Sequence, residues 1–163
     1  MARQPASSIL TADQEKALRA AGSFVDEMPP FEKRASTLAT RRNINLLAHS
    51  FSTAEVADLL KVSQARIRQR ATVRGLLAVK AGTKWRFPRF QFTADGEVTG
   101  WSRIAPIFPE SAHPTSIAWF AQTPHSDLVV AGEAVSPIDW LAGGGSAERV
   151  SALVHVVFDV RGS

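Results

Sequence analysis

Cysteine is absent from the 163-residue chain, which excludes disulfide bonds and metal sites built on thiolates. Long apolar runs are absent as well: no stretch approaches the roughly 20 apolar residues that a membrane-spanning helix needs. The first residues also lack the apolar segment of a secretion signal. These absences predict a cytoplasmic protein that neither crosses a membrane nor is exported.

Recognisable catalytic motifs are missing too. The histidines are scattered and show no HExxH or comparable ligand spacing; they are His49, His113, His125 and His155. The GGGS segment at residues 143–146 lacks the lysine of a phosphate-binding loop, so the end of a helix explains it better. A triad of Ser136, His125 and Asp139 has no nucleophile-elbow pattern around it, and Ser136 is better explained as a helix cap. We therefore predict no enzymatic activity, no cofactor and no metal site.

Negative charge is absent from one long segment. No carboxylate lies between Asp58 and Asp95, whereas nine basic residues do: Lys61, Arg66, Arg68, Arg70, Arg74, Lys80, Lys84, Arg86 and Arg89. Residues 1–58 hold seven basic and seven acidic side chains, and residues 93–163 hold three basic and eight acidic ones. A run of one sign attracts polyanions, whereas an ordinary solvated surface mixes both signs. A basic middle and an acidic end predict two functions in one chain.

The basic run begins inside a helix-turn-helix pattern, FSTAEVADLLKVSQARIRQRATVRG. Thr53 is the expected N-cap of the first helix, and Glu55 stands in its first turn. A buried face is predicted from the i, i+3, i+4 spacing of Val56, Leu59 and Leu60. Lys61-Val62 forms the expected turn.

The second helix of this pattern is expected to start at the cap residue Ser63 and to end at Gly75. Ile67 and Ala71 face inward at i, i+4. The outer surface and its edges then hold the predicted DNA contacts Gln64, Arg66, Arg68, Gln69 and Arg70. Arginine and glutamine suit the bidentate recognition of guanine and adenine edges in the major groove. Thr53 and Ser63, at the two helix starts, complete the set predicted on the helices.

A β-hairpin, LLAVKAGTKWRFP, is expected to follow as a wing. Leu77 and Val79 alternate with Ala78 and Lys80, the turn is Ala81-Gly82-Thr83, and Trp85 and Phe87 alternate with Lys84 and Arg86. This alternation predicts an apolar face on the helices and a cationic face. The predicted DNA contacts of the wing are Lys80, Lys84 and Arg86.

From Phe51 to Phe92 the segment resembles the winged helix-turn-helix of excisionase and MerR-like DNA-binding proteins. The shared features are TAEVADLL, the VS that opens the second helix, and a small wing that ends in WRFP. The helix-turn-helix pattern and its positive charge predict double-stranded DNA as a partner, with an RNA- or protein-binding use of the same fold as the alternative. One departure is Arg70, which stands where such proteins often carry a leucine and which indicates different packing of the second helix.

Two helices are expected before this segment. The first follows a cap at Thr11, and Pro29-Pro30 ends it. The second is predicted from about Phe31 to Ser50. Arg41-Arg42 in its middle is interpreted either as part of a solvated face, which we favour, or as additional phosphate contacts.

The C-terminal half shows a different pattern. A short helix is expected over 99–108, a helix capped by Thr115 over 116–121, and a hairpin over 128–135. Ser136-Pro137 is a favourable helix start, Gly143-Gly144-Gly145 a helix end, and Ser146 the cap of a last helix.

Between Ile107 and Phe158 the segments HPTSIAWF and TPHSDLVVAGEAVSPIDWLAGGGSAERVSAL resemble the toxin-binding domain of Xre/MbcA/ParS-like antitoxins. The resemblance implies neutralisation of a RES-domain toxin, an enzyme that consumes NAD. Trp140 is predicted either as an interface residue or as core, and Asp139 and Glu148 as charges that steer a basic partner.

Together these patterns predict an α+β, mainly α, protein: a winged helix-turn-helix plus a small helical and hairpin interaction domain. The expected boundaries are 1–50 for N-terminal helices, 51–92 for the DNA-binding domain, and 93–163 for the acidic toxin-binding-like domain. The leading hypothesis is a DNA-binding antitoxin of a type II system, which represses its own operon, neutralises a RES-like toxin and forms a homodimer. The alternative is a DNA-binding transcriptional regulator or recombination accessory protein without a toxin.

Overall fold

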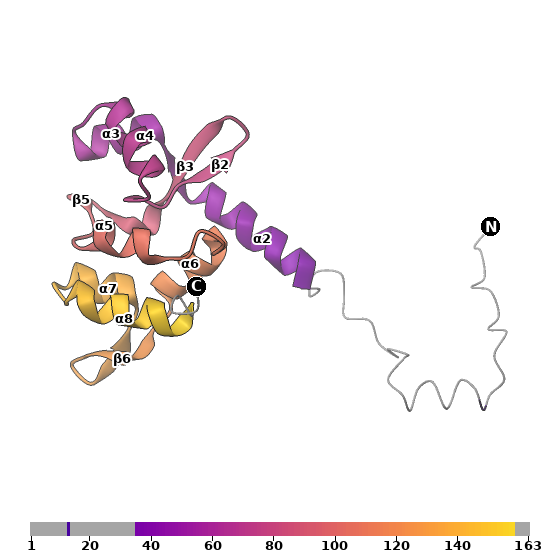
Figure 1. Ribbon diagram of the computed structural model, residues 1–163, viewed down its shortest axis with the longest axis vertical. Coiled ribbons are helices and arrows are strands. Elements are labelled where there is room, and N and C mark those ends of the chain that lie inside the picture. The colour runs from indigo at the N-terminus through magenta and orange to yellow at the C-terminus, as the bar shows by residue number, and fades with distance from the viewer. Residues whose placement is uncertain (1–12, 14–34, 159–163) are drawn as a thin grey trace. The chain divides into compact units, whose positions relative to one another are not determined.

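The computed structural model describes residues 35–158 together with Asp13 (Figure 1). The helix predicted after Thr11 therefore lies outside the described residues. Contacts between α-carbons divide the chain into Met1–Ala39 and Thr40–Ser163, a boundary that falls within helix α2. The described part is mainly helical with three small antiparallel sheets, which confirms the predicted α+β, mainly α class.

The first half of the described chain runs through these elements in order: α2 (Ala35–Ala48), β1 (Ser50–Ser52), α3 (Thr53–Leu60), α4 (Gln64–Thr72), β2 (Val79–Ala81), β3 (Lys84–Pro88) and the 3-10 helix η2 (Arg89–Gln91). The second half follows with β4 (Phe92–Thr93), β5 (Gly96–Glu97), α5 (Trp101–Ile104), the 3-10 helix η3 (Ala105–Ile107), α6 (Pro114–Gln122), β6 (His125–Val130), β7 (Glu133–Val135), α7 (Pro137–Ala142) and α8 (Ala147–Val157).

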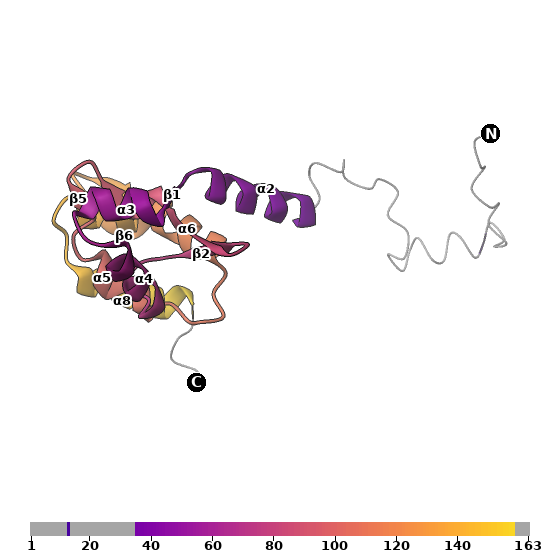
Figure 2. The same ribbon diagram turned by 90° about the horizontal axis from the view of Figure 1, so that it is seen from above.

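The helix-turn-helix packs on a sheet with the strand order β1-β3-β2. Figure 1 shows α3 and α4 beside the β2–β3 hairpin, and Figure 2 separates α3 from α4, which lie close together in the first view. The sequence pattern did not predict β1, which pairs antiparallel with β3 so that Phe51 is the partner of Phe87. A small core holds this part together; its buried residues are Val56, Ala57, Ile67, Ala71, Leu76 and Phe87.

A larger core lies in the chain after residue 97. Its fully buried members include Trp101, Phe108 and Leu128. The Phe108 ring meets the rings of Phe120 and Phe158 edge to face, at centroid distances of 5.7 and 5.1 Å. Such contacts add to the free energy gained by burying the rings. Both cores belong to the compact unit that begins at Thr40, and Leu77 and Phe90 also pack against the larger core.

Gln91 connects the backbone at Leu77 and Pro88 to Trp101 of the larger core. Its side chain is fully buried, and its Oε1 accepts hydrogen bonds from the Leu77 N–H at 2.9 Å and the Trp101 indole N–H at 2.8 Å. Its Nε2 donates to the carbonyls of Leu77 and Pro88 at 2.8 and 3.1 Å. A buried amide is stable only when its donors and acceptors are satisfied, and this one satisfies backbone groups as well.

Most helix starts in the C-terminal half follow the expected chemistry. Ser136 caps α7, since its Oγ accepts from the Asp139 N–H at 3.2 Å and donates to the Asp139 carboxylate at 2.6 Å. Ser146 is the N-cap of α8 but makes no side-chain capping bond. The cap predicted at Thr115 is wrong. α6 starts two residues earlier because His113 Nδ1 accepts from the Thr115 N–H and Pro114 occupies the first helical position.

Candidate nucleic-acid interface

The first helix of the candidate interface is held by a capping box. Ser52, and not Thr53 as predicted, is the N-cap of α3. The Ser52 Oγ accepts from the Glu55 N–H at 3.2 Å, and the Ser52 N–H donates to the Glu55 carboxylate at 2.7 Å. That backbone hydrogen bond lowers the pKa of Glu55, with smaller contributions from the Ser52 hydroxyl, Arg86 and Arg89. Thr53 is the first helical residue and is half-buried.

The turn into the second helix has the predicted position. Lys61 adopts a left-handed conformation with φ of 56°, and its N–H bonds back to the carbonyls of α3. Ser63 then caps α4 by accepting from the Arg66 N–H at 3.1 Å. The predicted end at Gly75 is wrong: α4 ends at Thr72, and Arg74, with φ of 61°, takes the left-handed position.

The exposed face of α4 carries most of the predicted DNA contacts. Ile67 and Ala71 are buried, as their spacing predicted. Exposed side chains follow on the other side of the helix: Gln64, Arg66, Arg68 and Gln69. The Arg66 Nη1 donates to the Gln69 Oε1 at 2.8 Å, which holds a guanidinium and an amide together on the exposed face. Because α4 contains no carboxylate, this face keeps its full positive charge.

Arg70 lies apart from this face. Its Nη2 donates to the Glu97 carboxylate of β5 at 2.5 Å, and the two side chains are only 22% and 17% exposed. The guanidinium that was predicted to contact DNA is thus paired with a carboxylate 27 residues later in the chain. Arg74, two residues after the end of the same helix, donates to the Phe108 carbonyl in the larger core. Both arginines connect α4 to the rest of the protein.

The wing forms, but with one face different from the prediction. β2 and β3 pair so that Lys80 is opposite Trp85 and Val79 is opposite Arg86. Directly opposed residues share a face of an antiparallel pair. Trp85 and Phe87 therefore share a face with Lys80, whose ammonium lies 4.9 Å from the Trp85 ring centroid. The prediction that placed Val79 with the aromatic residues and Lys80 with the cations is wrong.

The opposite face of the wing keeps two of the predicted cations. Lys84 is exposed near the tip, next to the turn in which Gly82 has a φ of 65°. Arg86 is half-buried and donates to the Ser50 carbonyl of β1 at 3.2 Å. Lys84 is consequently the freest wing cation among these three, while Arg86 also stabilises the sheet and Lys80 covers an aromatic ring.

The residues predicted to bind a protein partner have structural contacts of their own. Asp139 is exposed and belongs to the cap of α7. Trp140 is half-buried; its indole N–H donates to the Ser146 carbonyl at 3.1 Å, and Arg149 lies 5.5 Å from its ring centroid. Glu148 is exposed and forms a 3.8 Å ion pair with Arg103. A Cβ at Gly145 would lie 2.3 Å from the Trp140 indole nitrogen, so this tryptophan packs directly on the glycine segment.

The described part of the chain was also compared with the requirements of membrane-spanning helices and metal sites, and it meets neither. Between residues 35 and 158 no helix is both long and apolar enough to span a bilayer. In the same part of the chain, no group of three or more His, Asp and Glu side chains is arranged to hold a metal ion.

Comparisons with known proteins agree with this geometry. Residues 50–94 match the family model described as a helix-turn-helix domain, which supports DNA binding by this segment. No curated protein is significantly similar to the chain. Among solved structures, the chain is similar to the NMR structure of Rv2175c, with 24% sequence identity and a TM-score of 0.50 over 67% of this chain and 80% of that one. The likeness extends beyond the 45-residue helix-turn-helix segment, and it shows a shared fold.

Proposed function

We propose that the protein is a regulator that binds double-stranded DNA, with α4 in the major groove and the wing tip on the backbone. The observation that carries this proposal is the exposed face of α4, where Arg66, Arg68 and Gln69 stand without a neighbouring carboxylate on the helix. Arginine and glutamine present paired donors and acceptors that match guanine and adenine edges. Lys84 supplies a charge for a phosphate contact. The proposal includes no catalytic role and no cofactor.

The test is the double variant Arg66→Glu plus Arg68→Glu, measured by gel shift on DNA fragments selected from a random library by the wild-type protein. We expect binding to be lost at moderate salt with the thermal unfolding temperature unchanged, because both side chains are exposed. The matched control is Arg103→Glu plus Arg149→Glu, which makes the same charge change in the C-terminal half. Equal loss in both double variants would mean that net charge, and not the α4 face, determines the affinity.

Base recognition is separated from charge by Arg66→Lys, which keeps the positive charge and loses the planar paired donors. If Arg66 binds a guanine, this variant loses about 1–3 kcal/mol of discrimination at one base position. If Arg66 contacts only phosphate, affinity and preference stay nearly constant. Either way, wild-type binding should fall steeply between about 50 and 200 mM salt, as phosphate contacts require.

A second candidate function is that of an antitoxin, in which the C-terminal half neutralises a RES-like toxin and the DNA-binding half represses the operon. What supports it is the order of α6, the β6–β7 hairpin, α7, the glycine segment and α8, which follows the pattern of the resemblance. The predicted homodimer belongs to this proposal.

Co-expression with the product of the adjacent gene tests the antitoxin function. The variant Glu133→Lys plus Glu148→Lys reverses two exposed charges without disturbing the Asp139 cap. Loss of growth rescue at an unchanged unfolding temperature supports neutralisation through this acidic surface. An adjacent product that is harmless on its own would leave the DNA-binding regulator as the function.

A further inference from the structure

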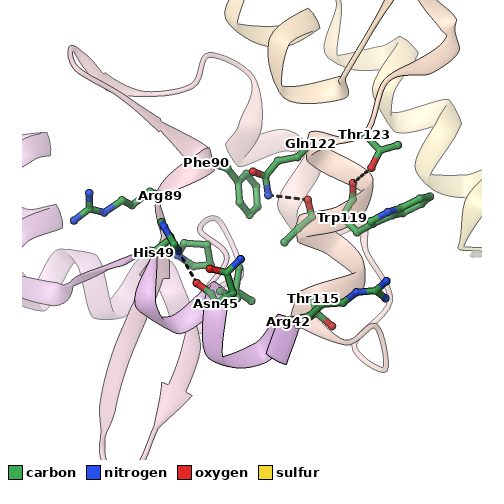
Figure 3. Close-up of a pocket in the computed structure, with 12 residues that line it drawn as sticks. Arg42, Asn45, His49, Arg89, Phe90, Thr115, Trp119, Gln122 and Thr123 are labelled. Carbon is green, nitrogen blue, oxygen red and sulfur yellow. Dashed lines mark hydrogen bonds between the residues drawn. The ribbon is translucent and has the colours of Figure 1, made fainter. Parts of the chain in front are cut away.

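A groove of about 640 Å³ opens between the C-terminal half of α2, the segment Pro88–Phe90 and α6 (Figure 3). Its lining residues include arginine, histidine, amide, hydroxyl and aromatic side chains, and no aspartate or glutamate. A smaller hollow of about 390 Å³ is lined by Arg42, Thr115, Ser116 and Trp119, three of which also line the groove. Apart from Arg42, for which a phosphate contact was the alternative interpretation, none of the residues predicted to bind DNA or a protein partner lines either space.

Arg42 is the cation that the groove offers to a ligand. It is exposed, and within the described part of the chain its side chain forms no hydrogen bond, ion pair or ring contact. Arg89, which also lines the groove, lies instead over the Phe51 ring at 4.6 Å from its centroid. Figure 3 shows Arg89 projecting away from Trp119, whereas Arg42 and Trp119 project in the same direction. The free guanidinium thus lies on the same side of the groove as the indole.

Trp119 is the second unusual member of this groove. Its side chain is 60% exposed, although its neighbours Ala118 and Phe120 are buried. The other tryptophans are covered: Trp101 is fully buried, and Trp85 and Trp140 are half-buried, each with a cation at its ring. Exposed tryptophan and arginine are typical of binding hot spots, because the indole gains free energy when a ligand removes water from it and the guanidinium can pair with an anionic group.

We propose that this groove binds a small organic anion that carries an aromatic ring. The ring stacks on the Trp119 indole, the anionic group binds the Arg42 guanidinium, and the hydroxyl of Ser116 can donate to it. The groove volume lies within the range of about 300–1,000 Å³ that is typical of small-molecule sites. DNA fits the groove less well, because a phosphate backbone requires several cations in a row. This proposal is independent of the function of α4.

The experiment follows the indole N–H signals of the tryptophans by NMR in the full-length protein, with the Trp119 signal assigned from Trp119→Phe. The probe is 3-phenylpropionate, and 3-phenylpropanamide is its uncharged match. We expect a saturable shift of the Trp119 signal, with the amide binding about tenfold more weakly because it lacks the charge. Arg42→Gln should weaken 3-phenylpropionate binding by a similar factor. Arg41→Gln, an exposed neighbour outside the groove, should leave it unchanged.

Three results would overturn the proposal. The first is the absence of a saturable Trp119 shift up to about 50 mM probe in the folded protein. The second is equal binding of the acid and the amide, since it would remove the role of Arg42. The third is equal weakening by Arg41→Gln and Arg42→Gln, which would indicate a diffuse charge effect. If the probe does not bind but Arg42→Gln lowers DNA affinity, the groove contacts phosphate instead.

Discussion

The helix-turn-helix segment and the C-terminal half of the compact unit differ in the size of their cores and in their surface charge. The first has a small core and a surface rich in arginine, with exposed cations along α4 and at the wing tip. The second has a larger aromatic core and a net negative charge. Burial of apolar area stabilises a fold, whereas like charges on one surface repel each other. We therefore expect the larger core to contribute to the folding stability of the helix-turn-helix segment.

Hydrogen bonds connect the helix-turn-helix segment to the C-terminal half. Gln91 bonds to Leu77 on one side and Trp101 on the other, and Arg74 of the helix-turn-helix donates to Phe108. A fragment that ends near Phe92 would lose Trp101 as a partner of Gln91 and Phe108 as the partner of Arg74. The basic region is therefore expected to depend on the C-terminal half for its stability.

The largest effect is expected from Trp101→Ala, which removes a fully buried indole from the larger core. Substitutions of this kind cost roughly 3–5 kcal/mol of unfolding free energy. Urea denaturation followed by circular dichroism should show one transition at a lower midpoint, with both regions unfolding together. Trp119→Ala, at an exposed position, is the control. A residual transition at the wild-type midpoint would mean that the helix-turn-helix is stable without the larger core.

A smaller loss is expected from Gln91→Met, which keeps the side-chain size and removes the polar junction. The Leu77 and Trp101 N–H groups and two carbonyls then lose their partner. Unsatisfied buried groups cost about 1–3 kcal/mol, so we expect a loss of roughly 2–3 kcal/mol in the same denaturation experiment. Gln122→Met, at an exposed position in α6, should have little effect. Two transitions in Gln91→Met would show that this residue alone couples the regions.

Arg70→Met sharpens the distinction between DNA-contacting and structural arginines. Because the Arg70–Glu97 pair is partly exposed, we expect a loss of about 1 kcal/mol, with DNA affinity nearly unchanged. The double variant Arg70→Met plus Glu97→Met should recover part of the stability, since it leaves no unpaired carboxylate. A large loss of DNA affinity in a still-folded Arg70→Met protein would show that Arg70 contacts DNA.

The smallest effect concerns pH and the capping box of α3. The pKa of Glu55 is lowered in the folded protein, so its contribution is present above the unfolded pKa and is lost as pH falls through the folded value. Glu55→Gln keeps the capping geometry without the titration. The stability difference between wild type and Glu55→Gln should therefore shrink between pH 7 and pH 3. A difference that stays constant across this range would show that the charge of Glu55 contributes nothing.

Sequence patterns predicted the local features well because local chemistry determines them. The cap at Ser63, the buried pair Ile67 and Ala71, and the Ser136-Pro137 helix start depend only on residues within one or two turns. The cap predicted at Thr53 is wrong because serine and threonine cap almost equally well and only Ser52 has a glutamate three residues later. The reciprocal hydrogen bonds between Ser52 and Glu55 place the cap at Ser52.

Features set by distant residues escaped prediction. The register of the wing depends on the two-residue turn at Gly82-Thr83 and on the pairing of β3 with β1. β1 is distant in sequence: Ser50, whose carbonyl accepts from Arg86, lies 36 residues before it. Arg70 has the right type and spacing for a DNA contact, and only the fold shows its pairing with Glu97. Gln91 lies in an aromatic run, where no local signal marks a buried amide. The groove at Arg42 combines three segments that are remote in sequence.

The hydrogen bonds of Gln91 also have a consequence for the rate of amide hydrogen exchange at Leu77. Leu77 lies in the irregular segment between α4 and β2, where amide hydrogens usually exchange with solvent within local fluctuations. Its N–H, however, donates to a fully buried acceptor that also holds the Trp101 indole. Exchange at Leu77 therefore requires the Gln91 amide to leave its buried position beside Trp101. In deuterated solvent this loop hydrogen should persist as long as those of the core helices, while the amide hydrogens at the wing tip are replaced early.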